Sequence, residues 1–267
     1  MAVLGIDQVQ HGPRRGASDA SPSDLFFNFV NPAAARGNPL QGAADQMSLV
    51  RFAKGLALAA GASPTGAEIR FGRISFWGHS QGATEGAVAM PYVADVSGVL
   101  FSGAGASLID ALLTKTSPVN IAAAVPFVLG EKGPIDAYHP VLSLLQNAID
   151  PADPLSHGRA LDKHVFVPFG QKDTYTPSAV QTTYVLAAGL GLAQAPPNVT
   201  PEPIGGLAAI SVPASANLQG GRTGLTRQYA PAGFDGHFVV FRDLVANRDA
   251  ARFLADVSRA APPRVGP

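Results

Sequence analysis

The stretch ISFWGHSQGATEGA, residues 74–87, constrains the fold of this chain most strongly. A run of β-branched and aromatic residues ends in the pentapeptide GHSQG, and small helix-forming residues follow at once. The pattern predicts a strand at 74–77, a tight turn, and a helix at 81–90. A strand that passes directly into a helix is typical of a sheet whose parallel strands are connected by helices.

The rest of the chain continues this alternation of strands and helices. Apolar runs predict further strands at 2–6, 98–102 and 164–169, and another strand is predicted at 225–230. Helical spacing predicts helices from Asp45 onward, at 177–190 and at about 241–258. The segment LAAISV, within 191–224, fits either an additional strand or a loop. We therefore expect an α/β fold with a mostly parallel sheet flanked by helices, in a single domain over residues 1–267.

The composition restricts the classes of function. With 267 residues, of which 46% are hydrophobic and 14% charged, the chain can bury a substantial core. Its formal net charge of zero gives no reason to expect nucleic acid as a partner, and the absence of cysteine excludes disulfides and thiolate metal sites. No segment has the apolar length of a membrane span, and the first residues do not resemble a signal peptide.

The pentapeptide fits the pattern G-x-S-x-G, in which a serine lies on a sharp turn between a strand and a helix. Flanking glycines leave room for the crossing backbones, and the turn lifts the hydroxyl of Ser80 above the sheet. We expect Ser80 to be a nucleophile and the backbone N–H of Gln81 to be one donor of an oxyanion hole. His79, inside the turn, is expected to be a packing residue.

A serine nucleophile needs a base, normally an imidazole that a carboxylate orients. His237 follows the last predicted strand in GFDGHFVVFRD and is the expected base, with capping of the final helix as the structural alternative. Asp173 follows an apolar run in HVFVPFGQKDTYTP and is the expected acid. Four other aspartates are weaker candidates because they precede strands, cap turns or shape the loop around His237: Asp95, Asp150, Asp153 and Asp235.

The chain order Ser80, Asp173, His237 resembles that of the α/β-hydrolase superfamily, and the chain is most similar to bacterial secreted lipases and esterases. The segments GIDQVQHGPR and FFNFVNPAAARGNPLQGAADQMSLVR resemble stretches that lead toward the nucleophile in that group. The resemblance implies a serine hydrolase that cleaves carboxylic esters of small molecules or lipids through an acyl-enzyme. It also implies export from the cell. Motifs for nucleotides or metals are missing from the sequence, so no cofactor or metal is expected.

Two features depart from this resemblance. If residues 2–6 correspond to the fourth strand of that fold, its first three strands are missing, together with the loop that supplies the second oxyanion donor. The pair His11-Gly12 is an alternative source of that donor, and a post-strand loop at the rim of the pocket is the preferred interpretation. A truncated or non-catalytic binding module, and an acyltransferase of the same fold, therefore stay open as alternatives.

A long, apolar and mostly helical passage at 104–150 interrupts the alternation of strands and helices. We interpret it as a helical cap over an acyl pocket, inserted after the strand that follows the nucleophile helix. An ordinary helical layer would show the same apolar spacing.

Overall fold

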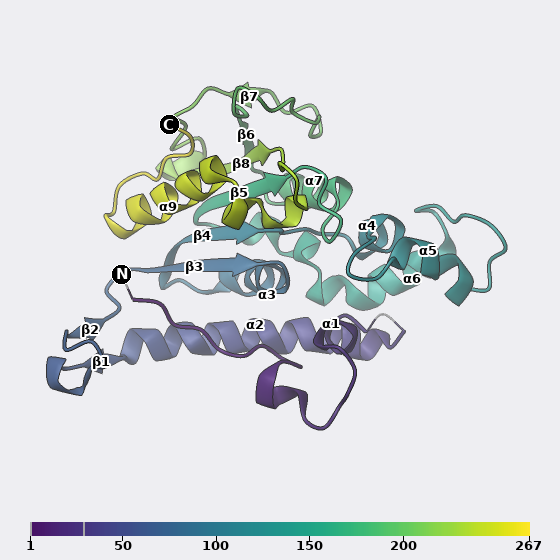
Figure 1. Ribbon diagram of the computed structural model, residues 1–267, viewed down its shortest axis with the longest axis horizontal. Coiled ribbons are helices and arrows are strands. Elements are labelled where there is room, and N and C mark those ends of the chain that lie inside the picture. The colour runs from purple at the N-terminus through teal and green to yellow at the C-terminus, as the bar shows by residue number, and fades with distance from the viewer. Residues whose placement is uncertain (1, 29) are drawn as a thin grey trace.

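The computed structural model describes residues 2–28 and 30–267 (Figure 1), and within them six strands form one sheet. The strands lie in the order β3–β4–β5–β8–β6–β7, and every neighbouring pair is parallel. Their bounds are β3 (Ile74–His79), β4 (Val96–Ser102), β5 (His164–Gly170), β6 (Gly191–Ala193), β7 (Ala209–Ile210) and β8 (Gly224–Tyr229). A short antiparallel pair, β1 (Ala57–Leu58) and β2 (Ile69–Arg70), lies outside this sheet. The predicted α/β architecture with a parallel sheet is confirmed.

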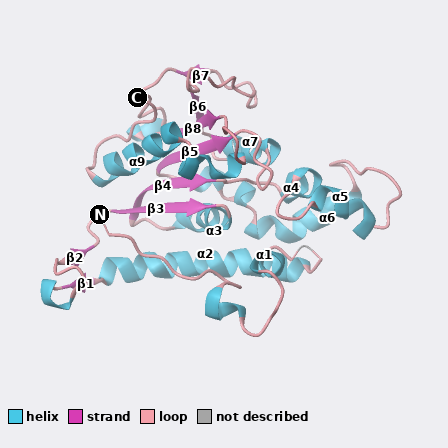
Figure 2. Cartoon of the chain, viewed as in Figure 1, coloured by secondary structure: helices cyan, strands magenta, loops and turns pink. Residues whose placement is uncertain are grey.

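Helices flank the sheet on both faces (Figure 2). Their bounds are α1 (Pro22–Phe26), α2 (Pro32–Gly55), α3 (Gln81–Ala89), α4 (Leu108–Thr114), α5 (Ile121–Val128), α6 (Pro140–Ile149), α7 (Ser178–Ala187), α8 (Val239–Arg242) and α9 (Leu244–Ser258). Within the described ranges, none of these helices combines the length and the apolar character that crossing a membrane requires.

The central strands are buried on both faces because alternate side chains enter different cores. On β4, Val99 and Phe101 pack in a cluster with residues of α2, α3 and α7. Leu100 between them faces the opposite way and packs with residues of α8 and α9, as does Phe166 on β5. This period of two is the reason these strands have continuous apolar sequences.

The prediction of a strand at residues 2–6 is wrong. This segment joins no strand among the described residues, and Val3 and Ile6 are exposed. Apolar character alone does not make a strand, since an extended segment also needs a neighbouring edge and a face to bury. The helix predicted from Asp45 begins earlier, at Pro32, where Asn31 Oδ1 accepts a hydrogen bond from the Ala34 N–H at 3.3 Å.

The other element predictions differ from the structure mainly at their ends. The final helix divides into α8 and α9 because Asp243 caps α9 by accepting a hydrogen bond from the Ala246 N–H at 2.8 Å. The LAAISV segment contributes the short edge strand β7.

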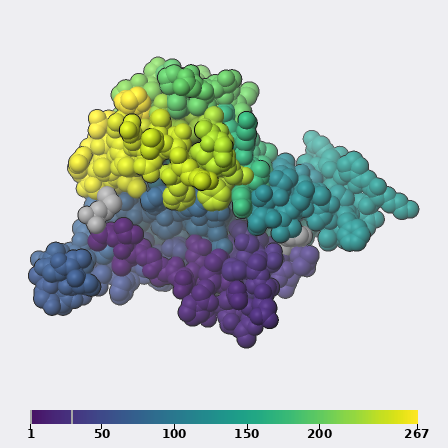
Figure 3. All heavy atoms as spheres, in the orientation of Figure 1, coloured from purple at the N-terminus to yellow at the C-terminus, as the bar shows by residue number. Residues whose placement is uncertain are grey.

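Helices α4, α5 and α6 lie between β4 and β5 in the sequence and share a small core of their own. Leu112, Val125 and Leu142 form its buried centre. In the space-filling view this segment projects from the rest of the molecule as a teal lobe (Figure 3). Because the lobe starts directly after β4, its first helix lies close to the carboxyl ends of the sheet strands.

Candidate active site

Ser80 lies at the carboxyl end of β3, at the junction with α3. Its backbone angles are φ 54° and ψ −119°, a conformation that costs about 1–3 kcal/mol for a residue with a side chain. Gly78 permits the turn, because a Cβ at this position would collide with the Gly82 carbonyl and lie 2.8 Å from the Ala83 nitrogen. The local sequence therefore forces the Ser80 side chain out of the strand–helix junction.

Gln81 is the first residue of α3, and no hydrogen bond among the described residues uses its backbone N–H. Its side-chain amide donates to Glu85 Oε1 at 3.2 Å, and the Gln46 amide of α2 donates to Glu85 Oε2 at 3.0 Å. Burial raises the pKa of Glu85, which is fully inaccessible to solvent. These bonds fix the start of α3 against α2 and leave the N–H of Gln81 available.

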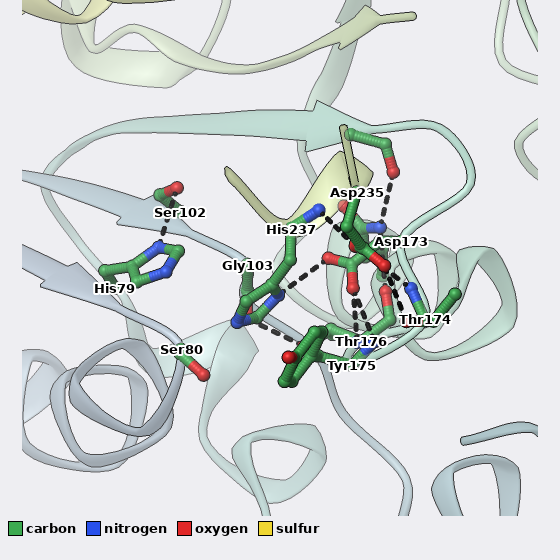
Figure 4. Close-up of polar contacts among 12 residues, drawn as sticks. His79, Ser80, Ser102, Gly103, Asp173, Thr174, Tyr175, Thr176, Asp235 and His237 are labelled. Carbon is green, nitrogen blue, oxygen red and sulfur yellow. Dashed lines mark hydrogen bonds and ion pairs between the residues drawn. The ribbon is translucent and has the colours of Figure 1, made fainter. Parts of the chain in front are cut away.

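Asp173 and His237 form a buried pair, with His237 Nδ1 2.9 Å from Asp173 Oδ2 (Figure 4). Asp173 Oδ1 accepts hydrogen bonds from the N–H groups of Tyr175 at 2.8 Å and Thr176 at 2.6 Å. The carboxylate is therefore held in place by its own loop, and its remaining oxygen orients the imidazole. With Nδ1 donating to the carboxylate, Nε2 is the nitrogen that can accept a proton.

A second aspartate joins the loops that carry this pair. Asp235 Oδ1 accepts a hydrogen bond from the His237 N–H at 2.9 Å, and Asp235 Oδ2 accepts one from Thr174 Oγ1 at 2.6 Å. Gly170 and Gly236 let the loops approach closely, since a Cβ on either would collide with backbone of the other loop. These contacts agree with the prediction that Asp235 shapes the loop around His237.

The imidazole of His237 is enclosed by rings. Tyr175 stacks on it with centroids 4.7 Å apart and planes at 19°, and His79 lies at the same centroid distance with planes at 51°. Gly103, which follows β4 and has a φ of +57°, also borders the ring, because a Cβ there would lie 2.7 Å from His237 Cε1. His237 has little freedom to leave its position beside Asp173.

His79 contacts the site without belonging to the pair. Its Nδ1 lies 3.1 Å from Ser102 Oγ, and its ring meets Phe241 edge-on at 4.7 Å. Burial, and next the charge of the neighbouring His237, lower the pKa of His79 from 6.5 to about 4. His79 is therefore neutral near pH 7 and packs against His237 without adding a second charge.

Ser80, Gln81 and His237 line one cavity of about 800 Å³. Figure 4 shows Ser80 below and to one side of the His237 imidazole, and no hydrogen bond among the described residues involves the Oγ of Ser80. The lobe supplies one wall through α4 and through Ile121 and Ile149, and the N-terminal segment supplies another through α1 and residues around it. The lining is mostly apolar, which suits a substrate with hydrocarbon parts.

The other aspartates considered from the sequence have different roles. Asp95 pairs with Lys54 at 2.7 Å on the surface. Asp150 accepts a hydrogen bond from the Gln146 amide at 2.8 Å, and Asp153 accepts from the N–H groups at the start of α4. Among the described residues, neither Asp95, Asp150 nor Asp153 hydrogen-bonds to His237.

Three residues at the cavity were not expected from the sequence: Gln8, Lys115 and Tyr175. The amide Nε2 of Gln8 lies 3.1 Å from where a Cβ of Gly82 would be, which places residues 8–12 beside the start of α3. His11 also lines the cavity. No local pattern indicates Gln8, Lys115 or Tyr175, whereas His11-Gly12 was expected in a loop at the rim of the pocket, with an oxyanion loop as the alternative.

The comparisons with known proteins identify no family for this chain. The chain matches no protein-family model, and it has no significant match among curated proteins. Within residues 2–28 and 30–267, no three His, Asp or Glu side chains gather closely enough to hold a metal ion.

Proposed function

We propose that this protein is a serine hydrolase of the α/β-hydrolase type that cleaves carboxylic esters. One observation carries the proposal: a serine on a strained strand–helix turn lines the same cavity as the histidine of a buried Asp–His pair. All three residues follow the carboxyl ends of parallel strands, where ligands of open α/β sheets bind. The residue types that acyl transfer requires therefore come from three separate turns at one end of the sheet, which supports the proposal.

In the proposed reaction, Ser80 Oγ attacks the acyl carbon of the ester while His237 Nε2 takes the hydroxyl proton. His237 then gives that proton to the oxygen of the leaving alcohol, and the acyl group stays on Ser80. Water, activated by the same imidazole, releases the carboxylic acid. Asp173 holds the imidazole in the required tautomer and stabilises its charged form. The hydrogen bond between Ser80 and His237 is expected to form on substrate binding.

The oxyanion of the tetrahedral intermediate needs donors that point into the cavity. The backbone N–H of Gln81 is one, because it lies at the start of α3 and has no other partner in the described chain. We assign the side-chain amide of Gln8 as the second, since it lies at the cavity wall beside the start of α3. In this assignment a side chain takes the place of the backbone donor from an earlier loop.

The lobe of α4, α5 and α6 is the proposed cap over the acyl pocket. Its first helix presents Leu108, Ala111 and Leu112 to the cavity that contains Ser80. A small core within the lobe allows it to keep its shape while covering the site. An acyl chain bound against these residues would be removed from water, at about 25 cal/mol for each Å² of apolar surface buried.

Labelling by a fluorophosphonate probe tests the proposal. The probe should modify Ser80 in the folded protein, as read by intact mass and by the modified peptide, and Ser80→Ala should abolish the reaction. Ser23→Ala is the matched control, because Ser23 also lines the cavity but lies within α1 and not on a strand–helix turn. A folded protein that is not labelled at Ser80 would favour the non-catalytic binding module.

A further inference from the structure

Lys115 is a basic residue in the wall of the cavity and belongs to no part of the proposed machinery. It follows the last residue of α4, where its N–H donates to the Ala111 carbonyl at 3.0 Å. Its own carbonyl accepts a hydrogen bond from the Ala122 N–H at 3.1 Å. The backbone of Lys115 is therefore fixed between α4 and α5, and the stem of its side chain starts from a defined point.

In the described part of the chain, the ammonium group of Lys115 has no counter-charge at bonding distance. None of the ion pairs or hydrogen bonds among residues 2–28 and 30–267 involves its Nζ, which lies 5.3 Å from the ring centroid of Phe27. Burial lowers the pKa of Lys115, and the charge of Asp173 opposes this shift. The Lys115 ammonium is thus partly removed from water, and its contact with the Phe27 ring is only a weak cation–π interaction.

Two carboxylates beside the cavity, those of Asp173 and Asp153, already accept hydrogen bonds from other groups. Asp173 uses one oxygen for two N–H groups and the other for His237. Asp153 accepts hydrogen bonds from the N–H groups of Ser107, Leu108 and Leu155 and from the Gln146 amide. Asp24, the remaining carboxylate of the lining, is exposed to solvent.

Two other cations of the chain have a carboxylate partner. The buried Arg227 pairs with Asp249 at 2.5 Å, and the exposed Lys54 pairs with Asp95. A desolvated charge without a partner is unfavourable, and an anion that enters the cavity would relieve that cost. Lys115 is therefore placed as a receptor for negative charge in a mostly apolar cavity that also contains Ser80.

We infer that Lys115 binds an anionic group of the substrate, so that the enzyme prefers esters that carry a second, ionised carboxylate. Monoesters of dicarboxylic acids are the simplest members of this class. The inference rests on the proposed ester hydrolysis and names its substrate class. In that reaction the bond between the acyl carbon and the alcohol oxygen breaks, water supplies the new oxygen, and the second carboxylate stays unchanged beside the Lys115 ammonium.

Matched esters test the inference. The 4-nitrophenyl monoester of glutaric acid and 4-nitrophenyl pentanoate differ chiefly in the terminal carboxylate of the acyl chain. A charge-assisted hydrogen bond corresponds to roughly 10- to 100-fold in kcat/KM. We expect the wild type to prefer the anionic ester by about this factor and Lys115→Met to lose the preference while keeping its activity on pentanoate. Lys115→Arg should restore the preference, and Lys132→Met, an exposed lysine of the same lobe, should change neither rate.

A second pair places the carboxylate on the leaving group: 4-(pentanoyloxy)benzoate and its methyl ester. A preference for the anion in either pair that Lys115→Met removes supports the inference. Equal rates in both pairs, or a uniform loss in Lys115→Met, overturn it while the hydrolase proposal stands.

Binding of glutarate to the Ser80→Ala variant, measured by calorimetry, tests Lys115 without turnover. Binding that Lys115→Met weakens 10- to 100-fold supports the inference even if no ester is hydrolysed, and binding insensitive to this change overturns it. Failure of the hydrolase proposal would instead appear as the absence of fluorophosphonate labelling at Ser80, so the two failures are distinguishable.

Discussion

Substitution of Gly103 by alanine tests whether the position of His237 depends on the backbone that follows β4. Gly103 has a φ of +57°, and a Cβ there would lie 2.7 Å from His237 Cε1 and 2.9 Å from Nδ1. Neither distance occurs between unbonded atoms, so the imidazole must move. It cannot move freely, because Asp173 bonds to its Nδ1 and Tyr175 covers its face.

Two costs add up in Gly103→Ala. The left-handed backbone costs an L-residue about 1 kcal/mol, and the overpacked contact adds about 1–3 kcal/mol, so the free energy of unfolding should fall by about 2–4 kcal/mol. Displacement of the imidazole by about 1 Å should lower kcat about a hundredfold or more.

Gly189→Ala is the matched control for the backbone cost. Gly189 has a φ of +64°, and a Cβ there would meet nothing within 4 Å. This variant should therefore lose only about 1 kcal/mol in urea denaturation and keep its esterase activity. A second control introduces Gly103→Ala into the His237→Ala variant. Because the imidazole is absent there, Gly103→Ala should lower the free energy of unfolding only by the backbone cost of about 1 kcal/mol.

Two results would contradict a clash between residue 103 and the His237 imidazole. Equal stability and equal activity of Gly103→Ala and Gly189→Ala would show that the ring tolerates a Cβ at position 103. An excess destabilisation that persists in the His237→Ala background would show that the clash involves another group.

Three further predictions concern neighbouring residues. Gln8→Ala should lower kcat about a hundred- to a thousandfold with little change in stability, if its amide is an oxyanion donor; a loss confined to KM would contradict that role. Because the pKa of His79 falls from 6.5 to about 4 on folding, the unfolded chain binds a proton that the folded protein excludes, and stability should fall as the pH falls through this window. The decrease in the free energy of unfolding corresponds to about 3 kcal/mol, and solvent screening at the partly exposed ring should reduce it. His79→Gln should make the free energy of unfolding, measured by urea denaturation, depend less on pH between pH 4 and 7. Burial raises the pKa of Glu85 above 4.5, so the contribution of Glu85 to stability decreases as the pH rises above this value. Glu85→Gln should therefore gain stability relative to wild type over that range, as measured by urea denaturation.

Strands β4 and β5 could be predicted from the sequence because both of their faces are buried, which requires a nearly continuous apolar run. Strands β3 and β8 do not share this pattern, since Trp77 of β3 is exposed and β8 contains three buried polar residues, Thr226, Arg227 and Gln228. The segment at 2–6 has a composition similar to that of β4 and β5 but no partner strand among the described residues, and sequence alone cannot distinguish the two cases. The start of α2 was also missed, since Pro39 lies inside that helix and normally indicates a break.

Ser80, Asp173 and His237 could be proposed from the sequence because each follows a predicted strand, Ser80 directly and the other two after a loop. The strand fixes the end of the sheet at which the side chain emerges, so local signals are sufficient. Gln8 and Lys115 reach the cavity through packing between segments far apart in the sequence, and no local signal accompanies that packing.

The topology of the sheet explains why Asp173 and His237 meet. After β5 the chain forms α7, β6 and β7, and then returns to insert β8 between β5 and β6. The pairing of β5 with β8 extends to the ends of both strands, where Gly170 lies opposite Tyr229 and the Gln171 N–H donates to the Tyr229 carbonyl at 2.9 Å. The two loops therefore leave adjacent strands at the same level, and glycines are required where their backbones touch. A side chain at Gly170 or Gly236 would separate the loops and break the bond between Asp173 and His237, although neither glycine has any chemistry of its own.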